Sequence, residues 1–142
     1  MKVVLDTSII VEIDRKNSRA IKTIKNLIGN NHDILVSSVT ISEILAGSYL
    51  RKDFERAVQE AKRLLGQFLW IDFDARIAEK TAQYIAYLIT EGKIIEYQDI
   101  AIAATFKAED ADYLLTQNKT HFESLPDLKG KVCSLAEFEK II

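Results

Sequence analysis

Three carboxylates stand alone in apolar stretches of the sequence. Each is the only charged residue of its stretch: Asp6 in residues 3–11, Glu43 in residues 39–50 and Asp99 in residues 97–106. Exposed helix faces normally carry interspersed acidic and basic residues, so these isolated acids are expected to be partly buried. A buried carboxylate is costly unless it is hydrogen-bonded, protonated or bound to a cation. None of the three stretches contains a Lys or Arg that supplies the counter-charge.

Carboxylate oxygens without a matching set of Cys and His residues favour Mg²⁺ or Mn²⁺ as the cation. The chain has one Cys and two His, which excludes a zinc site built from those residue types and an internal disulfide. If the three acids converge, their mutual repulsion disfavours the charged forms unless a divalent cation neutralises the cluster. The pattern therefore predicts a shared site for Mg²⁺ or Mn²⁺.

Each of these polar residues also has a structural interpretation. Asp6 and Asp99 each stand at the predicted start of a helix, where a carboxylate caps the first turn, and taken singly capping is the commoner role. Glu43 lies several residues inside its predicted helix, where capping does not apply. Asn118 follows a predicted strand and can be a turn residue. Both interpretations stay open for the single residues, while the joint pattern favours a functional site.

Length and composition limit the kind of protein. The chain has 142 residues, of which 48% are hydrophobic and 28% charged, which predicts a single domain over residues 1–142 with one sizeable core. Its net charge of −2 excludes a chain-wide basic surface, so nucleic-acid binding requires a local patch. No apolar run is long enough for a signal peptide or a spanning helix, so we expect no membrane partner and a reducing, cytoplasmic location.

Short apolar stretches alternate with longer amphipathic ones. Strands are predicted at residues 3–5, 34–36, 70–73, 113–115 and 132–133. Helices are predicted from residues 6–8 to 11, from Ser18 to 29, from Ser37-Ser38 to about 50, over 53–69, from Asp74 to about 90, from Gln98-Asp99 to 107, and after Ser134, whose capping-box partner is Glu137. This order predicts an α/β fold with a central, mainly parallel sheet and helices on both faces. Chemistry in such folds lies beyond the carboxyl ends of the strands, where Asp6 and Asn118 are expected.

Four stretches of the sequence together carry a resemblance to a known family. They are Val4-Leu5-Asp6-Thr7-Ser8, then Ser37-Ser38-Val39-Thr40-Ile41-Ser42-Glu43-Ile44, then Asp99-Ile100-Ala101-Ile102-Ala103-Ala104, then Leu115-Thr116-Gln117-Asn118-Lys119-Thr120-His121-Phe122. With these motifs the sequence resembles the PIN-domain nucleases, specifically the VapC-type toxins of toxin–antitoxin pairs. The resemblance covers essentially the whole chain, and although each motif alone is weak, four in order at family-like spacing are specific.

The resemblance implies a Rossmann-like fold and an endoribonuclease that hydrolyses RNA phosphodiester bonds with Mg²⁺ or Mn²⁺. It assigns metal coordination to Asp6, Glu43 and Asp99. The fourth acidic position of the family falls on Asn118, where many members have Asp, so one negative charge is lost and a second metal is held less firmly. The hydroxyl groups that support such a site correspond to Thr7, Ser8 and Thr116.

The resemblance also implies partners. Family members are commonly homodimers, and an antitoxin segment laid across the site holds the nuclease inactive. The predicted helix 74–90 offers apolar surface for a second copy, although the core of the domain can absorb most of it. The residues concerned are Ile77, Ala78, Thr81, Tyr84, Ile85 and Leu88.

Substrate binding requires positive charge near the acids. Arg15, Arg19 and Lys22 are spaced by four and three residues, so they form one stripe if the helix that starts at Ser18 extends back to Arg15. Most stripes of this kind are solvated helix faces. The stripe is therefore a weak prediction of RNA contact.

Other classes of protein fit the sequence less well. A phosphotransferase of the haloacid-dehalogenase type needs a second acid two residues after Asp6, where Ser8 stands. A receiver domain needs a phosphoacceptor Asp after the strand 34–36, which Ser37 follows instead. The stronger alternative is a catalytically degenerate PIN domain that binds RNA or a protein, because Asn118 replaces an acid. We interpret His121 as a turn or short-helix residue rather than a general base.

Overall fold

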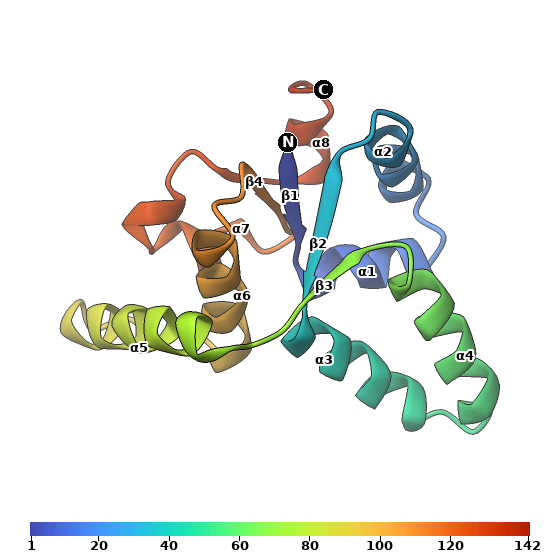
Figure 1. The fold of residues 1–142 in the computed structure, drawn as a ribbon, viewed down its shortest axis with the longest axis horizontal. Helices are drawn as coiled ribbons and strands as arrows, with labels where there is room; N and C mark the ends of the chain where they lie inside the picture. Colours follow the sequence, from blue (N-terminus) through green and yellow to red (C-terminus); the bar gives the residue numbers. More distant parts are fainter.

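A five-stranded parallel sheet runs through the centre of the computed structural model, which describes all residues from 1 to 142 (Figure 1). The strands are β1 (Lys2–Leu5), β2 (Asp33–Ser37), β3 (Leu69–Ile71), β4 (Tyr113–Leu115) and β5 (Val132–Cys133). Their order across the sheet is β3-β2-β1-β4-β5, and every neighbouring pair is parallel. The predicted α/β fold is confirmed, and β1 occupies the central position.

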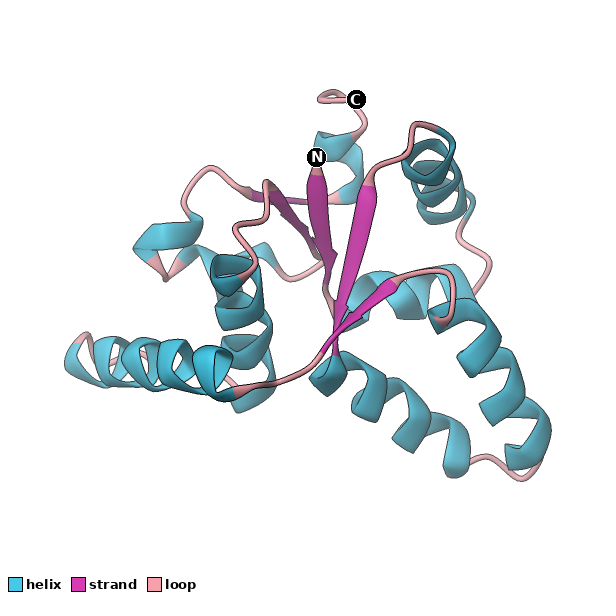
Figure 2. Cartoon of the chain, in the orientation of Figure 1, coloured by secondary structure: helices cyan, strands magenta, loops and turns pink.

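Helices cover both faces of this sheet (Figure 2). They are α1 (Thr7–Asp14), α2 (Ser18–Gly29), α3 (Ser38–Tyr49), α4 (Phe54–Leu65), α5 (Ala75–Thr90), α6 (Tyr97–Ala108), α7 (Lys119–Glu123) and α8 (Leu135–Phe138), with a 3-10 turn η1 at Pro126–Leu128. None of them is both long enough and apolar enough to cross a lipid bilayer.

Two hydrophobic cores form because successive strand residues point to opposite faces of the sheet. Val3 and Leu5 of β1 join the core under α1, α2 and α8, whereas Val4 joins the core under α5, α6 and α7. All three side chains are fully buried. Strands that are covered on both faces are apolar at nearly every position, so the sequence indicates where they lie.

Several helix boundaries follow the predicted caps. The side chains of Ser37 and Asp74 accept hydrogen bonds from the backbone N–H groups of their own helices. Ser134 and Glu137 form the predicted capping box of α8. Capping side chains satisfy N–H groups that have no partner within the helix, so these positions begin helices reliably.

Helix α2 spans Ser18–Gly29 as predicted, and the side chain of Asn17 caps it. Other boundaries differ from the prediction. Helix α4 ends at Leu65 rather than at residue 69, and β3 occupies residues 69–71 rather than 70–73. Helix α6 begins at Tyr97 with Glu96 at its N-cap, so Asp99 lies inside the first turn and not at the helix start.

Most of the apolar surface of α5 that was expected to face a second copy is buried in the core of the same chain. Four of its six residues are buried there: Ile77, Thr81, Tyr84 and Leu88. Exposed apolar side chains include Tyr49, Leu50 and Phe54 at the turn between α3 and α4, and Ile89, Ile94 and Tyr97 around the turn between α5 and α6.

Candidate metal centre

Asp6 follows the central strand β1 and is almost completely buried, with 2% of its surface exposed. It stands at the N-cap position of α1, yet its side chain makes no capping bond. Its Oδ2 atom instead accepts hydrogen bonds from Ser8 Oγ at 2.6 Å and Thr116 Oγ1 at 2.7 Å. The capping interpretation of Asp6 is therefore wrong, because its carboxylate is held by hydroxyl groups.

These two hydroxyls are themselves oriented by the turn that follows β4. The backbone N–H of Gln117 donates to Ser8 Oγ at 3.0 Å, and that of Asn118 donates to Thr116 Oγ1 at 2.9 Å. Each hydroxyl oxygen thus accepts a backbone hydrogen bond and donates its own hydrogen bond to Asp6 Oδ2. Such chains polarise their members and strengthen each bond. The pairing of β1 with β4 brings the two segments together.

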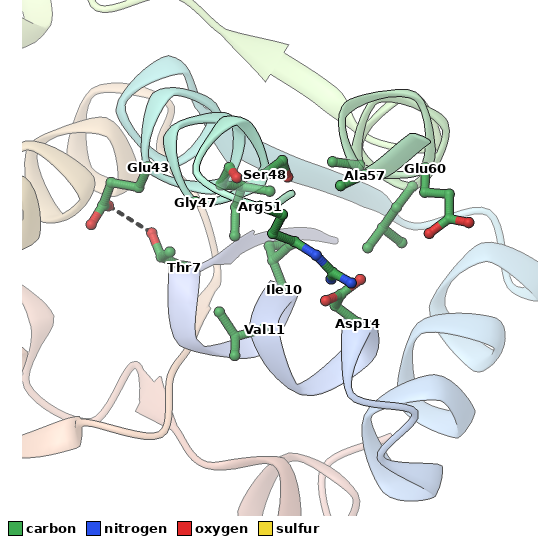
Figure 3. Close-up of a pocket in the computed structure, with 13 residues that line it drawn as sticks. Thr7, Ile10, Val11, Asp14, Glu43, Gly47, Ser48, Arg51, Ala57 and Glu60 are labelled. Carbon is green, nitrogen blue, oxygen red and sulfur yellow. Dashed lines mark hydrogen bonds between the residues drawn. The ribbon is translucent and has the colours of Figure 1, made fainter. Parts of the chain in front are cut away.

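Glu43 lies on α3, the helix that follows β2. Thr7 Oγ1 donates to its Oε1 atom at 2.8 Å, the contact drawn as a dashed line in Figure 3. The same hydroxyl lies 3.0 Å from Thr40 Oγ1, one turn before Glu43 on α3. A hydroxyl from the first motif therefore holds the acid of the second.

Asp99 has a different partner. Its Oδ2 atom lies 2.8 Å from Nδ1 of His121, a residue of α7. Helix α6 has no side-chain cap bond at its start, so the capping interpretation of Asp99 is also wrong. This role of His121 was not predicted from the sequence, because nothing in the local pattern of residues 118–122 indicates a contact with Asp99, 22 residues away.

The acids lie within reach of one another's charge. Burial raises the pKa of Glu43 above its ordinary value; the hydrogen bond from Thr7 opposes this, while the charges of Asp6, Asp99 and Glu96 raise the pKa further. Burial likewise raises the pKa of Asp99, opposed by the hydrogen bond from His121 and reinforced by the charges of Asp6 and Glu96. The charge of Asp6 thus acts on both Glu43 and Asp99, which lie far from it in sequence. A shared metal site for the three acids stays a prediction.

Glu96 is a fourth carboxylate close enough to act on these acids, and it was not predicted from the sequence. It stands one turn before Asp99 at the N-cap of α6, is exposed, and makes no capping bond. Its charge acts on both Glu43 and Asp99. In sequence it stands just before the stretch 97–106 rather than alone within it, so only the fold reveals that it adds negative charge near the acids.

The chemistry of this donor set fits a hard divalent cation. Each of the three acids has one oxygen held by a protein donor, namely Asp6 Oδ2, Glu43 Oε1 and Asp99 Oδ2. The other oxygen of each acid accepts no protein hydrogen bond, and none of these free oxygens is sealed in the interior. As the side chains stand, no three Asp, Glu, His or Cys residues are close enough together to hold one ion. Like charges without a counter-ion keep apart, and a bound cation favours their approach.

Asn118 lies at the start of α7 beside this group of acids. Its side chain is exposed and makes no capping bond, while its backbone N–H donates to Thr116 as described above. A neutral amide at this position adds an oxygen without adding charge.

The predicted basic stripe is wrong. The chain leaves the helical conformation after Asp14, and Lys16 adopts a left-handed backbone with φ of 64°. Arg15 therefore lies outside α2. Arg19 forms an ion pair with Glu139 at 3.4 Å, and α2 leads into the start of β2, away from the carboxyl ends of the strands (Figure 1).

A groove of about 330 Å³ opens beside Glu43 and Thr7, between α1, α3 and α4 (Figure 3). Its apolar lining consists of Ile10, Val11, Ile44, Ala57, Ala61 and Leu64. Asp14, Glu43 and Glu60 give the groove an excess of negative charge over its one basic residue, Arg51. The groove therefore suits an apolar segment that also carries positive charge.

Comparison with known proteins identifies the family. The model of the PIN domain matches residues 3–128, which is most of the chain. The chain belongs to the PIN-domain family. Within it, this PIN domain is similar to Ribonuclease VapC19 of Mycobacterium tuberculosis, with 32% identity over 125 residues, 88% of this chain and 95% of the relative. It is also 26% identical to Ribonuclease VapC2 of Haemophilus influenzae over 129 residues, 91% of this chain and 96% of the relative.

Solved structures show the same fold. The PIN domain superimposes on a chain of VapBC2 from Rickettsia felis bound to a DNA fragment from their promoter, with a TM-score of 0.84, 27% identity, and coverage of 94% of this chain and 98% of that one. DNA-bound VapBC from Salmonella typhimurium gives a TM-score of 0.85 at 22% identity, covering 95% and 98%. The chain thus belongs with the VapC ribonucleases of toxin–antitoxin systems in sequence and in fold.

The raised pKa of Glu43 predicts how stability depends on pH. A carboxyl whose pKa is raised by folding binds its proton more tightly in the native state, so its stabilising effect is lost as the pH rises above the ordinary value of 4.5. We expect Glu43→Gln, measured with EDTA, to melt at a higher temperature than wild type at pH 7. The difference in melting temperature between Glu43→Gln and wild type should become smaller as the pH falls towards 4.5. The exposed acid Glu79 provides the control Glu79→Gln, and a difference for Glu43→Gln that does not change with pH would contradict the expectation.

Proposed function

We propose that this chain is a cytoplasmic endoribonuclease that hydrolyses RNA phosphodiester bonds with Mg²⁺ or Mn²⁺, and that it is the toxin of a toxin–antitoxin pair. The observation that carries the proposal is the arrangement of Asp6, Glu43 and Asp99. Each has one oxygen held by a protein donor and the other free, and no Lys or Arg pairs with any of them. The family membership and the ribonuclease relatives support the same conclusion.

The side chains of this site prepare a metal-dependent hydrolysis. Asp6, Glu43 and Asp99 would hold the ion, while Thr7, Ser8 and Thr116 keep the carboxylates oriented. When bound, Mg²⁺ or Mn²⁺ supplies Lewis-acid polarisation of the scissile phosphate and charge for the transition state. The free carboxylate oxygens repel the phosphodiester unless the cation is present, so cleavage depends on the metal. Water is the nucleophile, and the chain supplies no covalent one.

Loss of Asp6 tests the catalytic proposal. Asp6→Asn keeps the shape and the hydroxyl contacts but removes the charge, so we expect RNA cleavage to fall by about 100-fold or more, since even indirect disturbance of a metal site costs 10–100-fold. Wild-type cleavage should stop in EDTA and return with Mg²⁺ or Mn²⁺. Asp72→Asn, at an exposed acid outside the site, is the matched control. RNA binding without cleavage in the wild type would instead support the degenerate binding module.

The amide at position 118 tests the fourth position of the family. Asn118→Asp adds a carboxylate next to the acids, so we expect half-maximal cleavage at a lower Mg²⁺ or Mn²⁺ concentration with the same preferred RNA substrate. The measurement is a metal titration of the initial cleavage rate. An unchanged midpoint would make Asn118 a turn residue only.

We infer that the groove between α1, α3 and α4 takes a segment of a cognate antitoxin. The groove begins at Glu43 and Thr7, so a segment lying in it reaches the acids. Its apolar lining suits a helix or strand with an apolar face, and its negative charge attracts Arg or Lys. Structural neighbours of this chain are solved as toxin–antitoxin complexes. A homodimer is also proposed, with Tyr49, Leu50 and Phe54 offering exposed apolar surface.

Gly47 allows the antitoxin groove to be filled without strain. It lies on α3 in the groove, and a Cβ atom added there meets no other atom within 4 Å. We expect Gly47→Trp to fold and cleave RNA but to escape inhibition by the protein encoded next to its gene, measured as the inhibitor concentration that halves cleavage. High salt should weaken inhibition of the wild type.

Gly29, the last residue of α2, provides the matched control, because it also has open space around its Cβ position but lies outside the groove. Gly29→Trp should be inhibited like wild type. Equal inhibition of all three proteins would place the antitoxin elsewhere, and the absence of any inhibitory neighbour would remove the toxin assignment while leaving the nuclease intact.

A further inference from the structure

The contact between His121 and Asp99 is the one hydrogen bond to the acids that comes from a ring nitrogen. Nδ1 of His121 lies 2.8 Å from Asp99 Oδ2 and joins α7 to α6. Asp6 and Glu43 are held by the hydroxyls of Ser8, Thr116 and Thr7 instead. Asp99 has no such hydroxyl within its helix, because Thr105, the one Ser or Thr of α6, donates to the backbone oxygen of Ala101.

Helix α7 is anchored without the help of this contact. Phe122, next to His121, is 1% exposed and lies in the core under α5 and α6. Lys119 forms ion pairs with Glu137 of α8 at 2.8 Å and with Glu123 at 3.3 Å. Because α7 is fixed by its own core and ion pairs, His121 is presented to Asp99 from a rigid support.

The side chain of His121 contributes little to the fold itself. About half of it is exposed, 49%, whereas Asp99 is 19% exposed. A half-exposed side chain with one hydrogen bond adds little to the free energy of unfolding. The main effect of His121 is therefore on Asp99, because its Nδ1 atom holds one oxygen of that carboxylate.

We propose that His121 is the positioning residue of Asp99, holding Oδ2 so that Oδ1 stays free for the metal. This inference rests on the proposed metal-dependent function. The planar ring has two torsion angles and reaches across from a neighbouring helix, so it fixes the carboxylate more firmly than a solvent molecule does. Residues that hydrogen-bond to metal-binding side chains and orient them commonly have a strong effect on metal affinity.

The test is Mn²⁺ binding to the full chain, measured by isothermal titration calorimetry in the absence of RNA. His121→Leu removes the ring nitrogen, and we expect the Mn²⁺ dissociation constant to rise about tenfold or more. His121→Asn sets an amide N–H near the position of Nδ1 and should recover most of that loss. Thr120→Ala, at the neighbouring exposed residue of α7, is the matched control and should bind Mn²⁺ like wild type.

Two readouts separate the possible failures. The melting temperature of metal-free His121→Leu should equal that of wild type, so weaker binding is not caused by unfolding. If Asp99→Asn lowers Mn²⁺ affinity while His121→Leu binds like wild type, the positioning role is overturned and the proposed function stands. If Asp99→Asn itself binds Mn²⁺ like wild type, the metal site and the proposed function fail together. Weak binding by both His121→Leu and His121→Asn would also overturn the role of the Nδ1 hydrogen bond.

Discussion

Asp6 is a negative charge placed at the end of the central strand, where 2% of the residue is exposed and no protein cation compensates it. Burial of a carboxylate demands hydrogen bonds, and here two hydroxyls provide them. Those hydroxyls depend on backbone N–H groups of the turn after β4, so the parallel pairing of β1 with β4 is needed for the charge to be tolerated. Neutral donors satisfy the oxygen they contact and leave the net charge for a cation.

The same use of neutral donors explains why the pKa values of Glu43 and Asp99 stay raised. Thr7 and His121 each lower the pKa of the carboxyl they contact, yet burial and neighbouring charges raise it by more. A Lys or Arg at either position would relieve this repulsion and would also compete with a metal ion for the same oxygens. The site therefore gives up stability in the metal-free protein, a common compromise at functional sites.

The sequence predicted the sheet and the partial burial of the three acids because both leave local signals. Continuous apolar strands reflect burial on two faces, and an isolated charge in an apolar stretch reflects a buried carboxylate. Contacts between distant elements leave no such signal, so His121, Glu96 and the groove beside Glu43 were missed. The basic stripe failed because Asn17 caps α2 and Lys16 turns the chain before it. The capping prediction for Asp99 failed because the actual N-cap of α6, Glu96, lies three residues earlier.

The most direct measurement of the central claim is the anomalous difference density of a crystal grown with Mn²⁺. We expect a peak that contacts the free oxygens of Asp6, Glu43 and Asp99, at about the 2.1 Å typical of small hard divalent ions. Ser8, Thr116, Thr7 and His121 should keep their present hydrogen bonds to the other oxygens. Saturating Mn²⁺ with no peak at these oxygens, or a peak bound by other residues, would contradict this expectation.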